Sequence, residues 1–362
     1  MPELNELSID DKRNTRARFE QWVKNPKCEA NALSAVLNVK MSDVAKNLGY
    51  DPEFGQSPFA ITRGLQFEGW LFKEQAKVLH GALVKSGMLK EEEAGLLDLR
   101  LTMNGGPKLK SIDEAIQKSS ELIESISKNP GKKIESIVAG LAVRIPKGVM
   151  LPEATLIIDV SLFTKEEDGI TIRVGEIKVY PDRGGHTDPS EIATARAQAG
   201  VYQHALTLAV EALELKNPLV VSTTGFLVFT WPGSNSPVIR PNEDLSFQAL
   251  RAKEGFEKLD SIALSLVNQK PENVSDHLDW VAHSRTEYRE SCWGFCDLAA
   301  RCQDLAIAED RAIVLGRDAA RLLGTLTVTR AIELLDGAKP DTAFEESLQY
   351  QLQLSNWDEA SA

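Results

Sequence analysis

The sequence lacks any run of about 18 consecutive apolar residues, so it predicts no membrane-spanning helix and no membrane partner. Its first 18 residues are charged and contain no apolar centre, which predicts that no signal peptide is present. We therefore expect a soluble, cytoplasmic protein that works in a reducing compartment.

Cysteine is also scarce, with four residues in a chain of 362. Cys28 stands alone near the beginning, whereas Cys292, Cys296 and Cys302 fall close together near the end. In a reducing compartment such a set more often ligates a metal than forms disulfides. The lone thiol can meet the other three only if the fold brings the two ends of the chain together. The alternative is four unrelated buried cysteines, because a free cysteine packs as a small apolar residue.

Positive charge is in deficit, since 41 Lys and Arg against 53 Asp and Glu give a net charge of −12. This balance argues against a broad surface that coats nucleic acid. The net negative charge does not exclude a local basic channel. It favours a protein that binds DNA together with a partner over one that binds long DNA alone.

The pattern of apolar residues changes twice along the chain, which predicts three consecutive regions. Residues 1–130 form N-terminal helices, 131–243 a core, and 244–362 C-terminal helices. The core contains apolar, β-prone runs and one helical stretch. The strand runs cover 134–145, 156–163, 170–180 and 219–231, and the helix covers 189–215. Strands flanked by helices predict a mixed α/β fold with a helical wrapping.

Within the first region, apolar spacing predicts helices over 62–86 and 112–128. The charged, glycine-containing stretch 91–106 between them predicts a loop or a short helix.

Charged residues lie within the two central strand runs. Asp159 ends the apolar stretch 156–158, and Glu176 and Lys178 share one face of the next run, because side chains alternate along a strand. If the strands pair, two carboxylates lie together, which is costly unless a cation neutralises them. Such oxygen ligands suit Mg²⁺ or Mn²⁺, and a nearby lysine can stabilise charge on a phosphate. The alternative is an exposed strand face with alternating charges.

The helix after these strands places Gln198 and Tyr202 on one face, because they are four residues apart. The ordered set resembles the RecB-like branch of the PD-(D/E)XK nucleases. Asp159, the segment 176–178 (Glu-Ile-Lys) and the segment 198–202 (Gln-Ala-Gly-Val-Tyr) resemble motifs II, III and IV, and 63–68 (Arg-Gly-Leu-Gln-Phe-Glu) resembles motif I. The resemblance implies a restriction-endonuclease-like mixed central sheet flanked by helices.

The same resemblance implies the metal ligands. Asp159 and Glu176 would bind Mg²⁺ or Mn²⁺ with help from the backbone carbonyl of Ile177. Glu68 would supply a further ligand, with His80 on the same expected helix as its rival.

The resemblance also implies the remaining roles. Lys178 would position the attacking water, while Gln198 and Tyr202 would steady the active-site face or the substrate backbone. The reaction would be metal-assisted hydrolysis of a phosphodiester.

The cysteines resemble those of an iron–sulfur group in this family, which includes CRISPR-associated RecB-type exonucleases and AddB-type helicase–nuclease subunits. Those proteins carry one cysteine before the nuclease core and three after it, which implies that Cys28, Cys292, Cys296 and Cys302 hold a [4Fe–4S] cluster. The cluster would join the N- and C-terminal helices. The gap between Cys292 and Cys296 is three residues where two is usual, so a four-thiolate zinc site remains the alternative.

These implications lead to one expected function and two alternatives. We expect a metal-dependent deoxyribonuclease, an exonuclease or DNA-end-processing enzyme, acting on single-stranded DNA or duplex ends. A protein partner in a defence or repair complex would fit its acidic surface. The alternatives are a non-catalytic nucleic-acid-binding or scaffolding subunit and a structural zinc protein with surface carboxylates.

Overall fold

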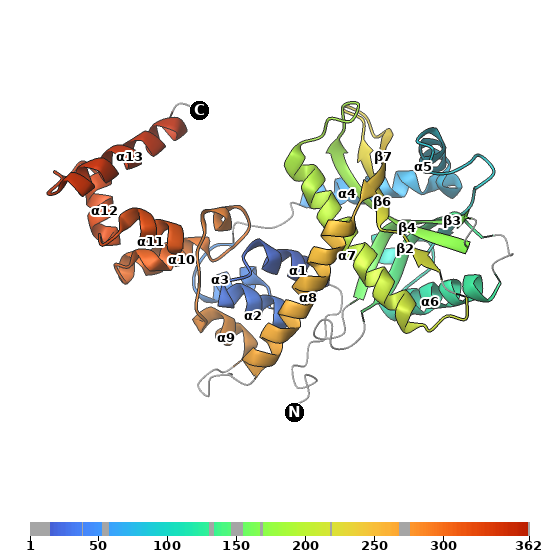
Figure 1. Cartoon of the computed structure of the whole chain (residues 1–362), viewed down its shortest axis with the longest axis horizontal. Coiled ribbons are helices and arrows are strands. Elements are labelled where there is room, and N and C mark those ends of the chain that lie inside the picture. Colours follow the sequence, from blue (N-terminus) through green and yellow to red (C-terminus); the bar gives the residue numbers. More distant parts are fainter. Residues whose placement is uncertain are drawn as a thin grey trace. The chain divides into compact units, whose positions relative to one another are not determined.

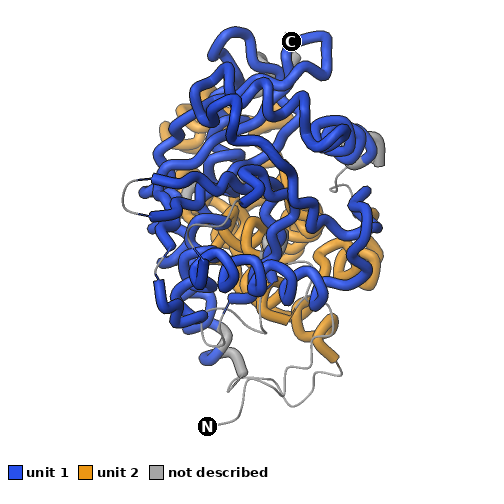
Figure 2. The backbone as a smooth tube through the Cα atoms, turned by 90° about the vertical axis from the view of Figure 1, so that its right-hand side faces the viewer, with its two compact units in different colours: residues 1–17, 56–265 blue, residues 18–55, 266–362 orange. Residues whose placement is uncertain are grey.

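The computed structural model divides the chain into two units, each made of two segments (Figure 2). Unit 1 comprises residues 1–17 and 56–265, and unit 2 comprises 18–55 and 266–362. The structure describes residues 15–37, 39–52, 58–129, 134–145, 155–166, 169–217, 219–267 and 276–360. The two units cut across the three consecutive regions expected from sequence, because 18–55 packs with the C-terminal helices rather than with the sheet.

Unit 1 is built on a seven-stranded mixed sheet, drawn in Figure 1. The order is β1-β2-β3-β4-β6-β7, with β5 also pairing with β4. The β2–β3, β3–β4 and β6–β7 pairs are antiparallel, and the others are parallel. The strands are β1 Leu96–Asp98, β2 Ile137–Arg144, β3 Thr155–Glu166, β4 Gly169–Pro181, β5 Val220–Val221, β6 Thr224–Thr230 and β7 Pro237–Asp244. The expected mixed α/β class is confirmed.

Five helices accompany the sheet in the described part of unit 1 (Figure 1). They are α4 Pro58–Leu71, α5 Lys73–Lys85, α6 Ile112–Lys128, α7 Pro189–Ala212 and α8 Ser246–Val267, which ends just beyond the unit's boundary. Capping explains where two of them begin. Ser111 accepts the backbone N–H of Glu114 at the start of α6, and Asp188 accepts that of Ser190 at the start of α7.

Two of these segments differ from the sequence-based expectation. The helix expected over 62–86 is divided between α4 and α5, and residues 74–76 have positive φ angles that do not continue a right-handed helix. The stretch 91–106, expected to be a loop or short helix, contains a short 3-10 helix at Thr102–Asn104. It also contains the strand β1, which was not expected and which pairs in parallel with β2.

The two faces of the sheet are covered by different helices. Residues of α4 and α5 share one apolar core with Val160 of β3, Ile177 of β4 and Phe226 of β6. Helix α7 packs against β2, β3, β4 and β6. Asp159 adjoins Val160 in sequence, and Glu176 adjoins Ile177. Because side chains alternate along a strand, both carboxylates project from the face opposite to the α4–α5 core.

Gly140 of β2 lies opposite Asp159, between the Ala139–Val160 and Leu141–Ile158 pairs. Its φ is 71°, in the left-handed region that favours glycine. A Cβ added there would lie 2.7 Å from the Cα of Arg100. The strand beside Asp159 therefore requires glycine for both conformation and space.

Most of unit 2 is helical. The helices are α1 Thr15–Lys24, which begins in unit 1, α2 Glu29–Leu37, α3 Met41–Asn47, α9 His277–His283, α10 Ala299–Ala308, α11 Arg317–Leu323, α12 Val328–Leu335 and α13 Ala343–Ala360. Helices α2 and α3 pack against α9, and the Ala30 N–H donates to the Arg285 carbonyl at 3.1 Å. Segments far apart in sequence thus form one unit. No helix within the described ranges is long and apolar enough to cross a membrane.

Replacing Gly140 with alanine should lower the free energy of unfolding by about 3 kcal/mol, from left-handed strain and overpacking together. Gly184→Ala is the matched control, because Gly184 has φ of 65° but no atom within 4 Å of the added methyl group. It should cost only about 1 kcal/mol. Urea denaturation measures both, and equal losses would contradict the close packing at Gly140.

Candidate carboxylate and cysteine sites

Asp159 lies at the point where β3 and β4 stop pairing. Their register ends at Val160 opposite Gly175, so Asp159 and Glu176 are the next residues on the two strands. The backbone N–H of Ile177 donates to Asp159 Oδ2 at 3.1 Å, and the Tyr202 hydroxyl donates to Asp159 Oδ1 at 3.1 Å. Both oxygens of this carboxylate are therefore held, one from β4 and the other from α7.

Glu176 is fully buried, and its Oε1 lies 2.6 Å from the Nζ of Lys178. The Lys178 side chain is 19% exposed, whereas the Glu176 side chain is fully buried, so Lys178 is the solvent-exposed member of this ion pair. An exposed strand face with alternating charges does not describe Glu176. The two-residue spacing has instead placed a carboxylate and its counter-charge on one face of β4.

Glu68 of α4 belongs to the same electrostatic group. Burial raises the pKa of Glu68 to about 8, the negative charges of Asp159 and Glu176 add to the rise, and Arg100 and Lys178 oppose it. His80, its rival in the sequence, lies in α5 with its Nε2 3.1 Å from the carbonyl oxygen of Glu93. The charges of the two strand carboxylates thus act on Glu68.

Gln198 and Tyr202 both face inward from α7. Tyr202 is fully buried, and Gln198 is 7% exposed. The Gln198 Oε1 is buried and has no hydrogen-bond partner within the described part of the chain. Tyr202 therefore has a defined contact with Asp159, whereas Gln198 keeps a carbonyl oxygen available.

Arg100 is a member of this neighbourhood that the sequence analysis missed. Its guanidinium forms a two-pronged ion pair with Asp98, with Nε–Oδ1 at 3.0 Å and Nη2–Oδ2 at 2.8 Å, and it stacks over the Phe72 ring at 4.5 Å. Its charge acts against the rise in the Glu68 pKa. The signal was present, because opposite charges two residues apart share one side of an extended chain.

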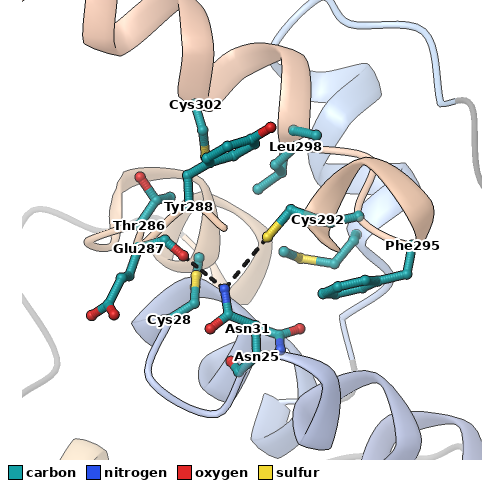
Figure 3. Close-up of a pocket in the computed structure, with 14 residues that line it drawn as sticks. Asn25, Cys28, Asn31, Thr286, Glu287, Tyr288, Cys292, Phe295, Leu298 and Cys302 are labelled. Atoms are coloured by element: carbon teal, nitrogen blue, oxygen red, sulfur yellow. Dashed lines mark hydrogen bonds between the residues drawn. The ribbon is translucent and has the colours of Figure 1, made fainter. Parts of the chain in front are cut away.

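The cysteines form a second site, which lies entirely within unit 2 (Figure 3). Cys28 precedes α2, Cys292 lies in the short 3-10 helix Glu290–Gly294, Cys296 follows that helix, and Cys302 lies in α10. All four are buried, none forms a disulfide, and together they line one cavity. The predicted meeting of the two ends of the chain is present in the structure.

The surroundings of three of these thiols disfavour the thiolate form. Burial raises the pKa of Cys28, of Cys296 and of Cys302, the last to about 11, and the other thiols of the set act in the same direction. A metal that binds here must therefore displace protons.

At neither site do the described side chains already surround a position for one metal ion. Among the residues that the structure describes, no three His, Cys, Asp or Glu side chains are gathered so as to hold a metal ion. At the carboxylate site the nearest cation is Lys178, paired with Glu176. No family model, curated protein or solved structure matches this chain, so its likeness to the RecB-like nucleases rests on the motifs given above.

Lys178→Met should lower the free energy of unfolding by about 3 kcal/mol, because it leaves the buried Glu176 carboxylate without its counter-charge. Adding Glu176→Gln to that variant should recover most of the loss. Lys118→Met is the matched control, since Lys118 pairs with Glu121 at 2.9 Å on the exposed side of α6, and it should leave stability unchanged. Denaturant titration of the four proteins measures these effects, and a double variant no more stable than Lys178→Met would contradict them.

Proposed function

We propose that unit 1 is a metal-dependent deoxyribonuclease domain with a restriction-endonuclease-like sheet. The observation that carries this proposal is the arrangement of Asp159 opposite Glu176 and Lys178 at the end of the β3–β4 pairing, with Tyr202 of α7 bonded to Asp159. Four separate motif residues thereby come to one face of one sheet. A chance pattern of surface charges gives no reason for that convergence or for the burial of Glu176.

The residues at this site suit a hard divalent cation. Asp159, Glu176, Glu68 and the Ile177 carbonyl offer the oxygen donors that Mg²⁺ and Mn²⁺ prefer. Burial is the main cause of the raised Glu68 pKa, and the negative charges of Asp159 and Glu176 add to it. A bound metal supplies Lewis-acid activation of water and stabilisation of charge on the scissile phosphate.

The protein's own groups then divide the work. Lys178 provides an amine that can orient the attacking water and oppose charge developing on phosphate oxygens. Tyr202 and the Ile177 N–H fix the orientation of Asp159. Gln198 would steady the same face from α7, where its buried Oε1 has no hydrogen-bond partner among the described residues.

The net negative charge of the chain limits which DNA substrates the protein can bind without a partner. A net charge of −12 disfavours an unaided grip on long duplex DNA. Single-stranded DNA or duplex ends are the proposed substrate, and a protein partner in a defence or repair complex would supply further DNA contacts.

For unit 2 we propose a [4Fe–4S] cluster held by Cys28, Cys292, Cys296 and Cys302. Four buried thiols from both segments of the unit line one cavity. In a four-thiolate zinc site every sulfur bonds one ion at about 2.3 Å, so the sulfurs stand within about 4 Å of each other. A four-iron cluster binds each of its four thiolates through a separate iron atom, and the four cysteines that line this cavity supply that number of ligands.

A second candidate function is a non-catalytic nucleic-acid-binding or scaffolding subunit. The Lys178–Glu176 pair favours it, because an amine beside that carboxylate competes with a metal ion. The nuclease assay below separates the two candidates.

Wild-type protein with Mg²⁺ or Mn²⁺ should degrade end-labelled single-stranded DNA, and Asp159→Asn or Lys178→Ala should slow this by about 100-fold or more. Tyr202→Phe, which removes only the hydroxyl donor to Asp159, should slow it by about tenfold. Lys118→Ala, on the exposed face of α6, is the control and should leave the rate unchanged. DNA binding without cleavage in either metal would favour the scaffolding function instead.

Protein purified without oxygen should be brown, absorb at about 400 nm and contain about four iron atoms per chain. Cys296→Ser should lose the iron and destabilise unit 2, because it removes one of four ligands at a buried site. Iron and zinc analysis of both samples is the measurement, and stoichiometric zinc without iron would establish the alternative.

A further inference from the structure

Asn25 is a buried amide that touches one of the four cysteines. It is 1% exposed and lies just after α1. Its Nδ2 donates to the Glu287 carbonyl at 2.7 Å and to Cys292 Sγ at 3.5 Å, the two dashed contacts in Figure 3. An amide nitrogen carries two hydrogens, so one group can serve both acceptors.

This contact links the two segments of unit 2 at a sulfur atom. Asn25 comes from the N-terminal segment and Cys292 from the C-terminal one. The same sulfur also accepts the backbone N–H of Arg289 at 3.4 Å. Only proline removes a main-chain N–H, and it also restricts the backbone, whereas the side-chain donor of Asn25 can be removed by a simple truncation.

Hydrogen bonds to ligand sulfurs tune the reduction potential of iron–sulfur clusters. An N–H donor withdraws electron density from the thiolate, which favours the reduced, more negative cluster. We propose that Asn25 is a positioning residue that raises the reduction potential of the cluster in unit 2 through its bond to Cys292. This inference rests on the proposed cluster and adds to it a means of control that uses a residue outside the ligand set.

Asn31 provides a matched comparison within the same unit. It is also 1% exposed, and its Nδ2 donates to the carbonyl oxygens of Gln21 and Asn25, both at 3.0 Å, and to that of Trp22. The hydrogen bonds given for its side chain run to backbone and to the Gln21 amide, and none reaches sulfur. The Asn31 side chain thus has the burial and amide chemistry of Asn25 without a bond to sulfur, and its backbone contact with Cys28 is kept when the side chain is truncated.

The test uses the full-length chain purified and reconstituted without oxygen. Iron and sulfide are measured first, and the reduction potential is then determined by an EPR-monitored redox titration. Asn25→Ala should keep its iron and show a tenfold change in the ratio of oxidised to reduced cluster at fixed potential, a fall of about 59 mV for a one-electron couple. Asn31→Ala should lower stability to denaturant and leave the potential unchanged.

Each other outcome has a defined meaning. A loaded Asn25→Ala protein with the wild-type potential would overturn the role of Asn25 while leaving the cluster intact. An equal fall in Asn31→Ala would show that any loss of packing shifts the potential, which also overturns it. Wild-type protein that takes up no iron would remove the cluster proposal and this inference together.

Asn25→Ser covers the case in which the alanine variant fails to fold. A serine hydroxyl cannot reach both acceptors of the longer amide, so the potential should still fall relative to wild type. An unchanged potential in a loaded Asn25→Ser protein would count against the proposal in the same way.

Discussion

The burial of one carboxylate beside another is the constraint on which unit 1 depends. Glu176 has no exposed surface, and Asp159 stands opposite it at the end of the β3–β4 register. Such a pair persists in a folded protein only when positive or hydrogen-donating groups meet it. Lys178, the Ile177 N–H and the Tyr202 hydroxyl supply those groups from β4 and α7. The strand register and the packing of α7 therefore hold Asp159, Glu176 and Lys178 close together. The proposed hydrolytic chemistry depends on this arrangement of charges.

Unit 2 faces the same difficulty with thiols. Four cysteines are buried together, and burial raises the pKa of Cys28, of Cys296 and of Cys302, the last to about 11. Binding of a metal by thiolates releases the protons that the thiols carry. The polar contacts around the set include the Asn25 amide at Cys292, which joins the two segments of the unit at one of these sulfurs.

The sequence predicted those features that depend on local periodicity. Helix α6 spans the expected 112–128, and the two-residue alternation placed Glu176 and Lys178 on one face. Features that arise from tertiary contact were not visible. Strand β1 is three residues long and exists because β2 pairs with it, and residues 74–76 leave the helical region within a pattern that reads as continuous helix.

The division into two units shows the same limit. Residues 18–55 look like the start of an N-terminal helical region, yet they pack with the C-terminal helices. The spacing of the cysteines was the only sequence signal for that association, because shared ligation requires the segments to meet. Asn25 was missed for a related reason, since its importance comes from Cys292 across the fold and not from its sequence neighbours. Arg100 had a local signal in its spacing from Asp98, but its electrostatic effect on Glu68 arises across the fold.

Binding of Mn²⁺ to the full-length chain, followed by EPR, tests the central claim most directly. The account predicts a bound ion in wild type that Asp159→Asn loses, and tighter binding in Lys178→Met, where the competing amine is gone. Equal Mn²⁺ binding by wild type and Asp159→Asn would contradict it.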